Sequence, residues 1–344
     1  MSVRRQIVPL STLLGVALTA CLPKDTRPVP ARVDVTLSLS SGGVRVGTVD
    51  GWTVTLERGL LGIRSSLRGD ACADYAPEGY TRIVDPFLDG HQKVNTLYSL
   101  GHCDIGFSVQ SPSVDPYTPL GEHVTPADHA FMNVPGLDPY TVTSGKPVAT
   151  GVAFHVTGRA VRGAQTKTFA WSFRQRTSSS RCAAPLDERE DAGPLRDARA
   201  SDHGGPVDGG DAGSIPFYSD AGPPGPRGLD LTSAGDVRAD LVVHPETLFL
   251  DSTNLAVASP RFDVLALADD RYGNGDGEVT IGELGLVPLE EVGGRGRYQQ
   301  PPPLAEPPPA TWKTLEDFVY LGLYPRVVRY RDRGVCDVTI GGGR

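Results

Sequence analysis

Apolar and polar residues alternate one by one over several short stretches of this chain, and this pattern constrains the fold more than any other feature. Residues 33–39 and 52–57 show it most clearly, with β-branched residues at many positions. A period of two places the apolar side chains on one face of a strand. Similar strands are predicted at 105–109, 151–161 and 167–174, separated by clusters of Gly, Pro, Asn and Asp. We therefore expect a mainly β chain with an antiparallel, sandwich-like domain.

Segment 184–238 interrupts this pattern. It is rich in Gly, Pro and Asp and poor in large apolar residues, so it cannot bury enough surface to offset the entropy of ordering. We predict a long disordered insertion or linker between a β-rich first part at 33–183 and a second part at 239–344, packed on the first. The predicted elements of the second part are a strand at 241–244 with its exit at 247–250, short helices at 262–268 and 314–321, proline-rich spacers at 301–303 and 307–309, and a last strand at 335–340.

The N-terminus reads as an export signal. Two arginines precede a short apolar run at 7–20, which is too short to span a bilayer stably. Residues 18–21 (Leu-Thr-Ala-Cys) resemble the lipobox of bacterial lipoproteins. The resemblance implies that residues 1–20 are removed and that Cys21 is diacylated and becomes the mature N-terminus. The alternative is an ordinary signal peptide with a chance cysteine.

The lipobox resemblance also implies a location in the cell envelope. Lipid chains on Cys21 would anchor the protein to a membrane, and the proline-containing segment 21–32 would act as a tether. Leu22, in place of an aspartate, is similar to lipoproteins that are sorted to the outer membrane. The formal net charge is −8, which argues against nucleic acid as a partner. A protein or polysaccharide partner is left open.

Four cysteines remain after Cys21. An even number in an exported chain favours disulfides, and the absence of any C-x-x-C pair disfavours zinc. Three pairings are possible. We favour one local pair, which closes a short loop, and one distant pair, which ties the end of the chain to its middle: Cys72–Cys103 and Cys182–Cys336.

One glycine-rich acidic loop has a residue pattern typical of a metal site. Calcium needs several oxygen ligands at alternating positions of a tight turn, and residues 274–283 resemble most of an EF-hand loop. In that register Gly277 makes the turn, Val279 points to the core, and Glu283 is the bidentate carboxylate. The resemblance implies the following ligand set, with Glu278 contributing its backbone carbonyl: Asp270, Asn274, Asp276, Glu278, Thr280 and Glu283.

This loop departs from the EF-hand pattern at its first position. Tyr272 stands where the pattern has an aspartate, so Asp270 would have to swing in from a longer loop. Only one such loop is present, whereas calcium sensors of this family usually pair them. We therefore expect a structural calcium site with an affinity of about 0.1–1 mM; the alternative is an acidic turn that binds nothing.

The sequence carries none of the common hydrolase, metalloprotease or nucleotide-binding motifs, and its tryptophans are expected to fill the core. The arrangement is similar to poorly characterised, β-rich myxobacterial-type lipoproteins. We expect a non-enzymatic, membrane-anchored envelope lipoprotein with a binding or scaffolding role. One alternative is a calcium-dependent hydrolase whose site is not visible in sequence. The other is a periplasmic copper or zinc protein that uses His102, His123, His129, His155 or His244.

Overall fold

The computed structural model describes residues 28–73, 75–115, 117–143, 146–185, 214–216, 227–231, 235–294, 297–300 and 312–341. The predicted signal, Cys21, most of the tether, most of segment 184–238 and the proline-rich spacers lie outside these ranges. Among the described residues, no helix is long and apolar enough to cross a membrane.

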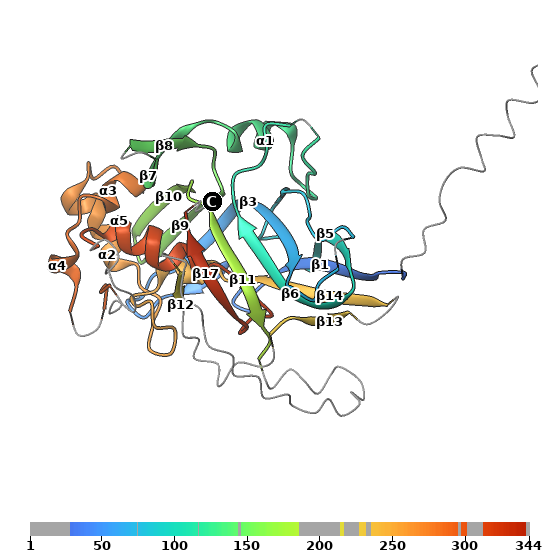
Figure 1. The fold of residues 1–344 in the computed structure, drawn as a ribbon. Coiled ribbons are helices and arrows are strands. Elements are labelled where there is room, and N and C mark those ends of the chain that lie inside the picture. Colours follow the sequence, from blue (N-terminus) through green and yellow to red (C-terminus); the bar gives the residue numbers. More distant parts are fainter. Residues whose placement is uncertain are drawn as a thin grey trace, which may run out of the picture.

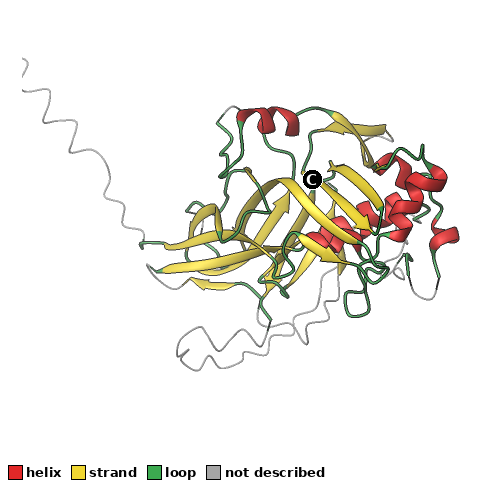
Figure 2. Ribbon diagram, turned by 180° about the vertical axis from the view of Figure 1, so that it is seen from behind, coloured by secondary structure: helices red, strands yellow, loops and turns green. Residues whose placement is uncertain are grey.

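The largest sheet has eleven strands and is organised around the long strand β3 (Thr53–Arg68), as Figures 1 and 2 show. The second half of β3 pairs with β6 (Gly101–Val109) and the first half with β9 (Phe154–Arg162), both antiparallel. From β9 the sheet continues through β10 (Gln165–Phe173) to the short β15 (Glu278–Val279). Its other strands are β2 (Arg45–Gly47), β4 (Arg82–Val84), β11 (Thr177–Ala183), β12 (Ser214–Pro216), β13 (Leu229–Leu231) and β17 (Val335–Ile340).

A second sheet has four strands, in the order β16, β14, β1, β5. β1 (Ala31–Leu39) runs parallel to β14 (Asp236–Val243) and antiparallel to β5 (Gln92–Ser99), and β16 (Val328–Tyr330) lies beyond β14. A separate hairpin is formed by β7 (Gly136–Thr143) and β8 (Lys146–Thr150). Strands from before and after segment 184–238 therefore share both large sheets.

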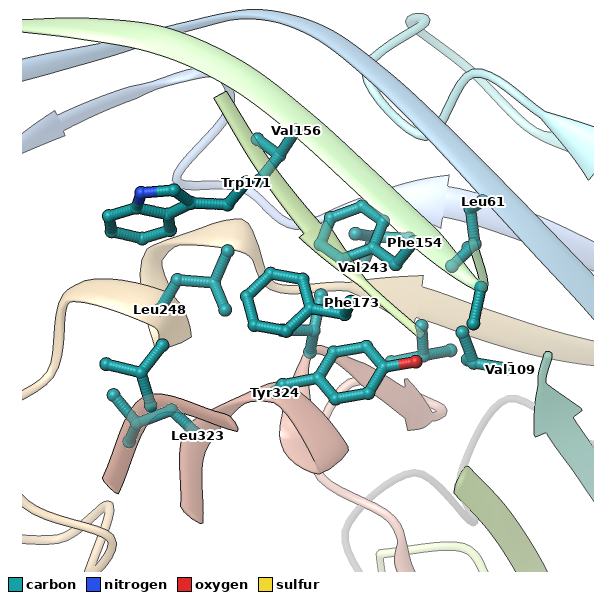
Figure 3. Packing of buried hydrophobic residues seen from close by; sticks show 14 of the residues in the cluster. Leu61, Val109, Phe154, Val156, Trp171, Phe173, Val243, Leu248, Leu323 and Tyr324 are labelled. Carbon is teal, nitrogen blue, oxygen red and sulfur yellow. The ribbon is translucent and has the colours of Figure 1, made fainter. Parts of the chain in front are cut away.

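The two large sheets enclose one apolar core. In β1, buried and half-buried residues alternate along the strand, as a strand with one face on the core requires. Figure 3 shows the aromatic centre of the core, where Phe173 stacks on Tyr324 with ring centroids 4.6 Å apart. Trp171 is fully buried and Trp52 almost so, while Trp312 is half-buried against the same core. The predicted mainly β, sandwich-like fold is confirmed.

The helices are few and short, as predicted. The predicted strand at 241–244 corresponds to the end of β14, and the chain leaves this strand through a 3-10 helix at 245–249. Pro245 stands at the first turn of this helix, where a fixed φ suits a helix start. The α-helices are α1 (Pro126–Met132), α2 (Asp263–Leu267), α3 (Ile281–Leu284), α4 (Leu289–Val292) and α5 (Leu315–Asp317). Two elements are π-helical, η4 (Ala268–Tyr272) and η5 (Phe318–Leu323), and two are 3-10 helices, η3 (Pro245–Phe249) and η6 (Tyr324–Arg326).

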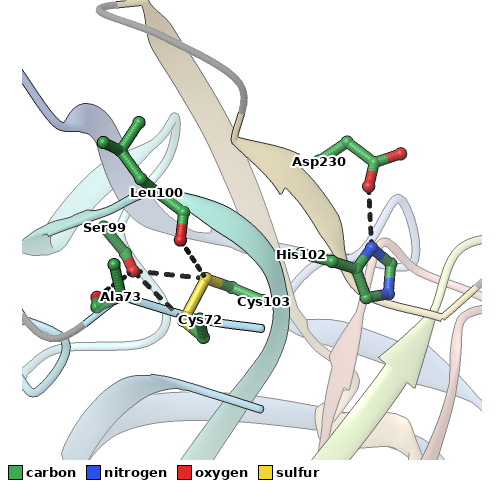
Figure 4. Close-up of a disulfide and its surroundings, with 7 residues drawn as sticks. All are labelled: Cys72, Ala73, Ser99, Leu100, His102, Cys103 and Asp230. Carbon is green, nitrogen blue, oxygen red and sulfur yellow. Dashed lines mark hydrogen bonds and ion pairs between the residues drawn. A yellow bond between two sulfur atoms is a disulfide. The ribbon is translucent and has the colours of Figure 1, made fainter. Parts of the chain in front are cut away.

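Two disulfides close the structure, and both have the predicted pairing. Cys72 bonds to Cys103 across 31 residues, beside Ser99 and the end of β5 (Figure 4). Cys182 bonds to Cys336 across 154 residues and joins β11 to β17. The second bond links the middle of the chain to its last strand.

Candidate functional site

The predicted calcium loop lies between two helical segments and touches the large sheet. α2 and η4 lead into it, and α3 follows it. Its central residues form β15, which runs parallel to β10 at the edge of the sheet. Val279 is fully buried, and its carbonyl accepts a hydrogen bond of 2.8 Å from the Trp171 indole N–H. The loop is thus attached to the sheet through both backbone and side-chain contacts.

A lysine from the sheet lies at the entrance to this loop. The Lys167 ammonium, on β10, donates to the carboxylates of both Asp269 and Asp270, in the first turn of η4. The Asp269 side chain is fully buried, and only a tenth of the Lys167 side chain is exposed. Asp269 also accepts a 3.0 Å hydrogen bond from the Gly277 amide. The lysine therefore connects the sheet, the entering helix and the turn of the loop.

Sequence reasoning missed Lys167 and Asp269, although the strand pattern contained a signal for the lysine. Lys167 has the same parity along β10 as the buried residues Phe169 and Trp171, so a period of two places it on the core face. A lysine on that face needs an anionic partner. Burial by itself would lower the pKa of Lys167, but the hydrogen bonds and charges of the two aspartates outweigh it and raise the pKa.

The other predicted ligands use their oxygens within the loop. The Asn274 side chain accepts from the Asp276 amide, and Asp276 accepts from the Glu278 amide. Hydrogen bonds from the Glu278 amide and from the Asn274 side-chain amide to the Asp276 carboxylate hold the pKa of the exposed Asp276 below its usual range. The Glu278 side chain is itself exposed, whereas its backbone lies in β15.

Glu283 and Thr280 together cap α3. The Thr280 hydroxyl accepts from the Glu283 amide at 3.2 Å, and the Glu283 carboxylate accepts from the Thr280 amide at 2.9 Å. The second Glu283 oxygen lies inside the loop, where it accepts from the Asn274 amide at 3.3 Å. A Cβ at Gly273 would come within 2.1 Å of this oxygen. Glycine at this position therefore lets the carboxylate sit over the loop backbone.

The loop meets some requirements of a cation site and lacks others. Segment 269–283 contains five acidic residues and one arginine, so it stays acidic after Lys167 has paired. One oxygen of buried Asp269 has no hydrogen-bond partner. However, no three Asp, Glu, His or Cys side chains among the described residues are grouped as metal ligands. Asp270 is held by Lys167, and Tyr272 donates to Glu291. Calcium binding stays a prediction.

The five histidines considered for a transition metal have separate partners. Each lies near a different acidic, hydroxyl or carbonyl group. The partners are Asp230 for His102 at 2.7 Å (Figure 4), Glu122 for His123 at 3.7 Å, the Ser113 carbonyl for His129 at 2.9 Å, Ser172 for His155 at 2.8 Å and Glu246 for His244 at 2.8 Å.

No protein-family model, curated protein or solved structure matches this chain. The chemistry of the loop therefore has to be read from its own residues. It joins a sheet edge to a helical segment through one buried ion-pair cluster, and it presents additional oxygens around the turn. This arrangement can fasten two parts of the fold together and can attract a hard cation.

Proposed function

We propose that this protein is a non-enzymatic, lipid-anchored envelope protein. In this proposal the loop at 269–283 braces the helical segment formed by α2 and η4 (263–272) against the large sheet. One observation carries the brace: the ammonium of Lys167 contacts Asp269 and Asp270, residues more than 100 positions away in the sequence. A buried ion pair of this kind holds its elements in one relative position, because breaking it leaves a buried charge without a partner.

We further propose that calcium completes the brace. The support is threefold: the acidity of the segment, the unpartnered oxygen of buried Asp269, and the Glu283 oxygen over Gly273. The unpartnered oxygen of Asp269 and the oxygens of Glu283, Asn274 and Asp276 would hold the ion. Such a site would stabilise the folded chain by mass action, since the ion binds the folded state and not the unfolded one.

The test of calcium is a thermal unfolding series. Calcium at millimolar concentration is expected to raise the unfolding midpoint of the wild-type protein above its value in chelator, whereas magnesium is not. Glu283→Gln is expected to abolish the rise. Glu290→Gln, an exposed residue on α4 outside the loop, is the matched control and should keep it. No rise in the wild type would remove calcium and leave the brace to its own test.

The proposed anchor is tested separately at Cys21. Expression in a bacterium with radiolabelled palmitate is expected to label the wild-type protein and place it in the outer-membrane fraction. Cys21→Ala should lose the label and leave the membrane fraction. Label on the Cys21→Ala protein would refute the lipobox interpretation.

A further inference from the structure

A surface cleft of about 370 Å³ lies between α2 and α4. Its volume is within the range of small-molecule sites. Val264 on α2 and Val292 on α4 form the apolar wall of the cleft. Its polar lining consists of Arg261, Arg297 and Tyr298 together with two aspartates, Asp50 and Asp263. None of these residues belongs to the loop at 269–283.

Tyr298 is the most unusual residue of this lining. It is 5% exposed, and its hydroxyl is buried with no hydrogen-bond partner among the described residues. Its ring is held edge-on by Phe318, and its backbone has a φ of +49°, which is rare for an aromatic residue. Burial, with the charges of Asp251 and Asp50, raises the pKa of Tyr298. The phenol therefore stays protonated, and it is a hydrogen-bond donor without a partner among the described residues, on a residue that lines the cleft.

Two arginines add further donors. Arg261 and Arg297 each contact the same oxygen of buried Asp251 through Nε, at 2.8 and 3.3 Å. Asp251 thereby orients both guanidinium groups. Their outer nitrogens have no hydrogen-bond or ion-pair partner in the part of the chain that the structure describes. Two oriented guanidinium groups with free donors form a suitable site for a carboxylate or phosphate group.

The two aspartates of the lining already have partners. Asp50 accepts from the amides of Phe262 and Asp263, both at 2.9 Å. Asp263 in turn accepts from the Trp52 indole at 2.9 Å and pairs with Arg162. Both oxygens of Asp50 and one oxygen of Asp263 are thus engaged. The outer guanidinium nitrogens of the two arginines and the Tyr298 hydroxyl have no partner among the described residues, so the free donors of the lining favour an anion.

We propose that this cleft binds a small organic anion, whose carboxylate or phosphate group contacts Arg261, Arg297 and Tyr298 and whose apolar body lies against Val264 and Val292. The proposal is independent of the anchor and of the calcium brace, because it uses none of their residues. It gives the protein a ligand site of defined chemistry.

The test is calorimetric titration of the full chain with three probes of similar size: benzoate, phenyl phosphate and the neutral benzamide. One of the two anions is expected to bind and benzamide is not; the anion that binds identifies the acid group. Arg297→Gln and Tyr298→Phe are each expected to weaken this binding about tenfold, the effect of losing one hydrogen bond to a charged group.

Two comparisons separate lost binding from misfolding. Tyr298→Phe removes a hydroxyl without a partner in the described structure, so its unfolding midpoint is expected to stay level or rise. Arg159→Gln removes an exposed arginine on β9, which pairs with Glu57, and should bind like the wild type. The proposal is overturned if neither anion binds, if benzamide binds equally well, or if Tyr298→Phe binds the anion with unchanged affinity.

Discussion

At the scale of single residues, Lys167 tests the brace most directly. Lys167→Met keeps the aliphatic stem but leaves Asp269 buried without its counterion. We expect the free energy of unfolding to fall by about 3–5 kcal/mol, as when one partner of a buried pair is removed. Urea unfolding measures this, with the exposed-pair variant Arg159→Gln as control, for which a loss of about 0–1 kcal/mol is expected.

The same cluster permits a compensation experiment. Adding Asp269→Asn to Lys167→Met removes the stranded charge, so the double variant is expected to regain part of the lost stability. If the double variant lost more unfolding free energy than the two single variants lose together, charge stranding would not be the cause of the loss.

The pH dependence of stability follows from the pKa of Lys167. The folded state holds this proton more tightly than the unfolded chain, where the pKa is near 10.5. The stabilisation is therefore complete below that value and is lost as the pH rises through the higher folded-state pKa. The difference in unfolding midpoint between wild type and Lys167→Met should stay constant between about pH 7 and 9 and shrink above about pH 10.5. A difference that grows with alkalinity would contradict the assignment.

At the scale of elements, hydrogen-bonded capping boxes mark the starts of three short helices, α1, α3 and α5. The Thr314 hydroxyl accepts from the Asp317 amide at 3.3 Å, and the Asp317 carboxylate accepts from the Thr314 amide at 3.0 Å. Thr314→Ala is expected to cost about 1 kcal/mol of unfolding free energy, the usual effect of losing an N-cap hydroxyl. Thr314→Ser retains the hydroxyl and should retain most of the stability. Equal losses in both variants would point to packing of the threonine methyl group.

Elements were predictable where the signal is local. Alternation located β1 and β10, and the capping pattern at 314–317 located the start of α5. The structure adds α1, whose Thr125–Asp128 capping box is equally local and was overlooked. It also adds β5 and residues 58–68 of β3. The middle of β3, residues 59–63, contains glycine and consecutive apolar residues in place of alternation. A strand that is buried on both faces over part of its length has no period of two to detect.

At the scale of the whole molecule, the disulfides constrain the chain most strongly. In the chain-entropy model the Cys182–Cys336 bond, which closes the longer loop, contributes about 5 kcal/mol and the Cys72–Cys103 bond about 4 kcal/mol. Replacing Cys182 and Cys336 together by alanine should therefore destabilise the protein at least as much as the same change at Cys72 and Cys103. Chemical unfolding of the two double variants measures the difference. A clearly larger loss at Cys72 and Cys103 would contradict the entropic explanation.

By itself, the sequence determined the period-two strands, the β class, the acidic loop and a preference for the cysteine pairing that the structure contains, because each of these depends on local pattern or on a choice among few alternatives. Only the tertiary structure decided that β1 pairs with β14, that Lys167 reaches Asp269, and that Tyr298 faces a cleft with two arginines. These partners lie far apart in the chain or in irregular segments. A local pattern indicates which face a side chain occupies, but it does not indicate which distant group will lie opposite that face.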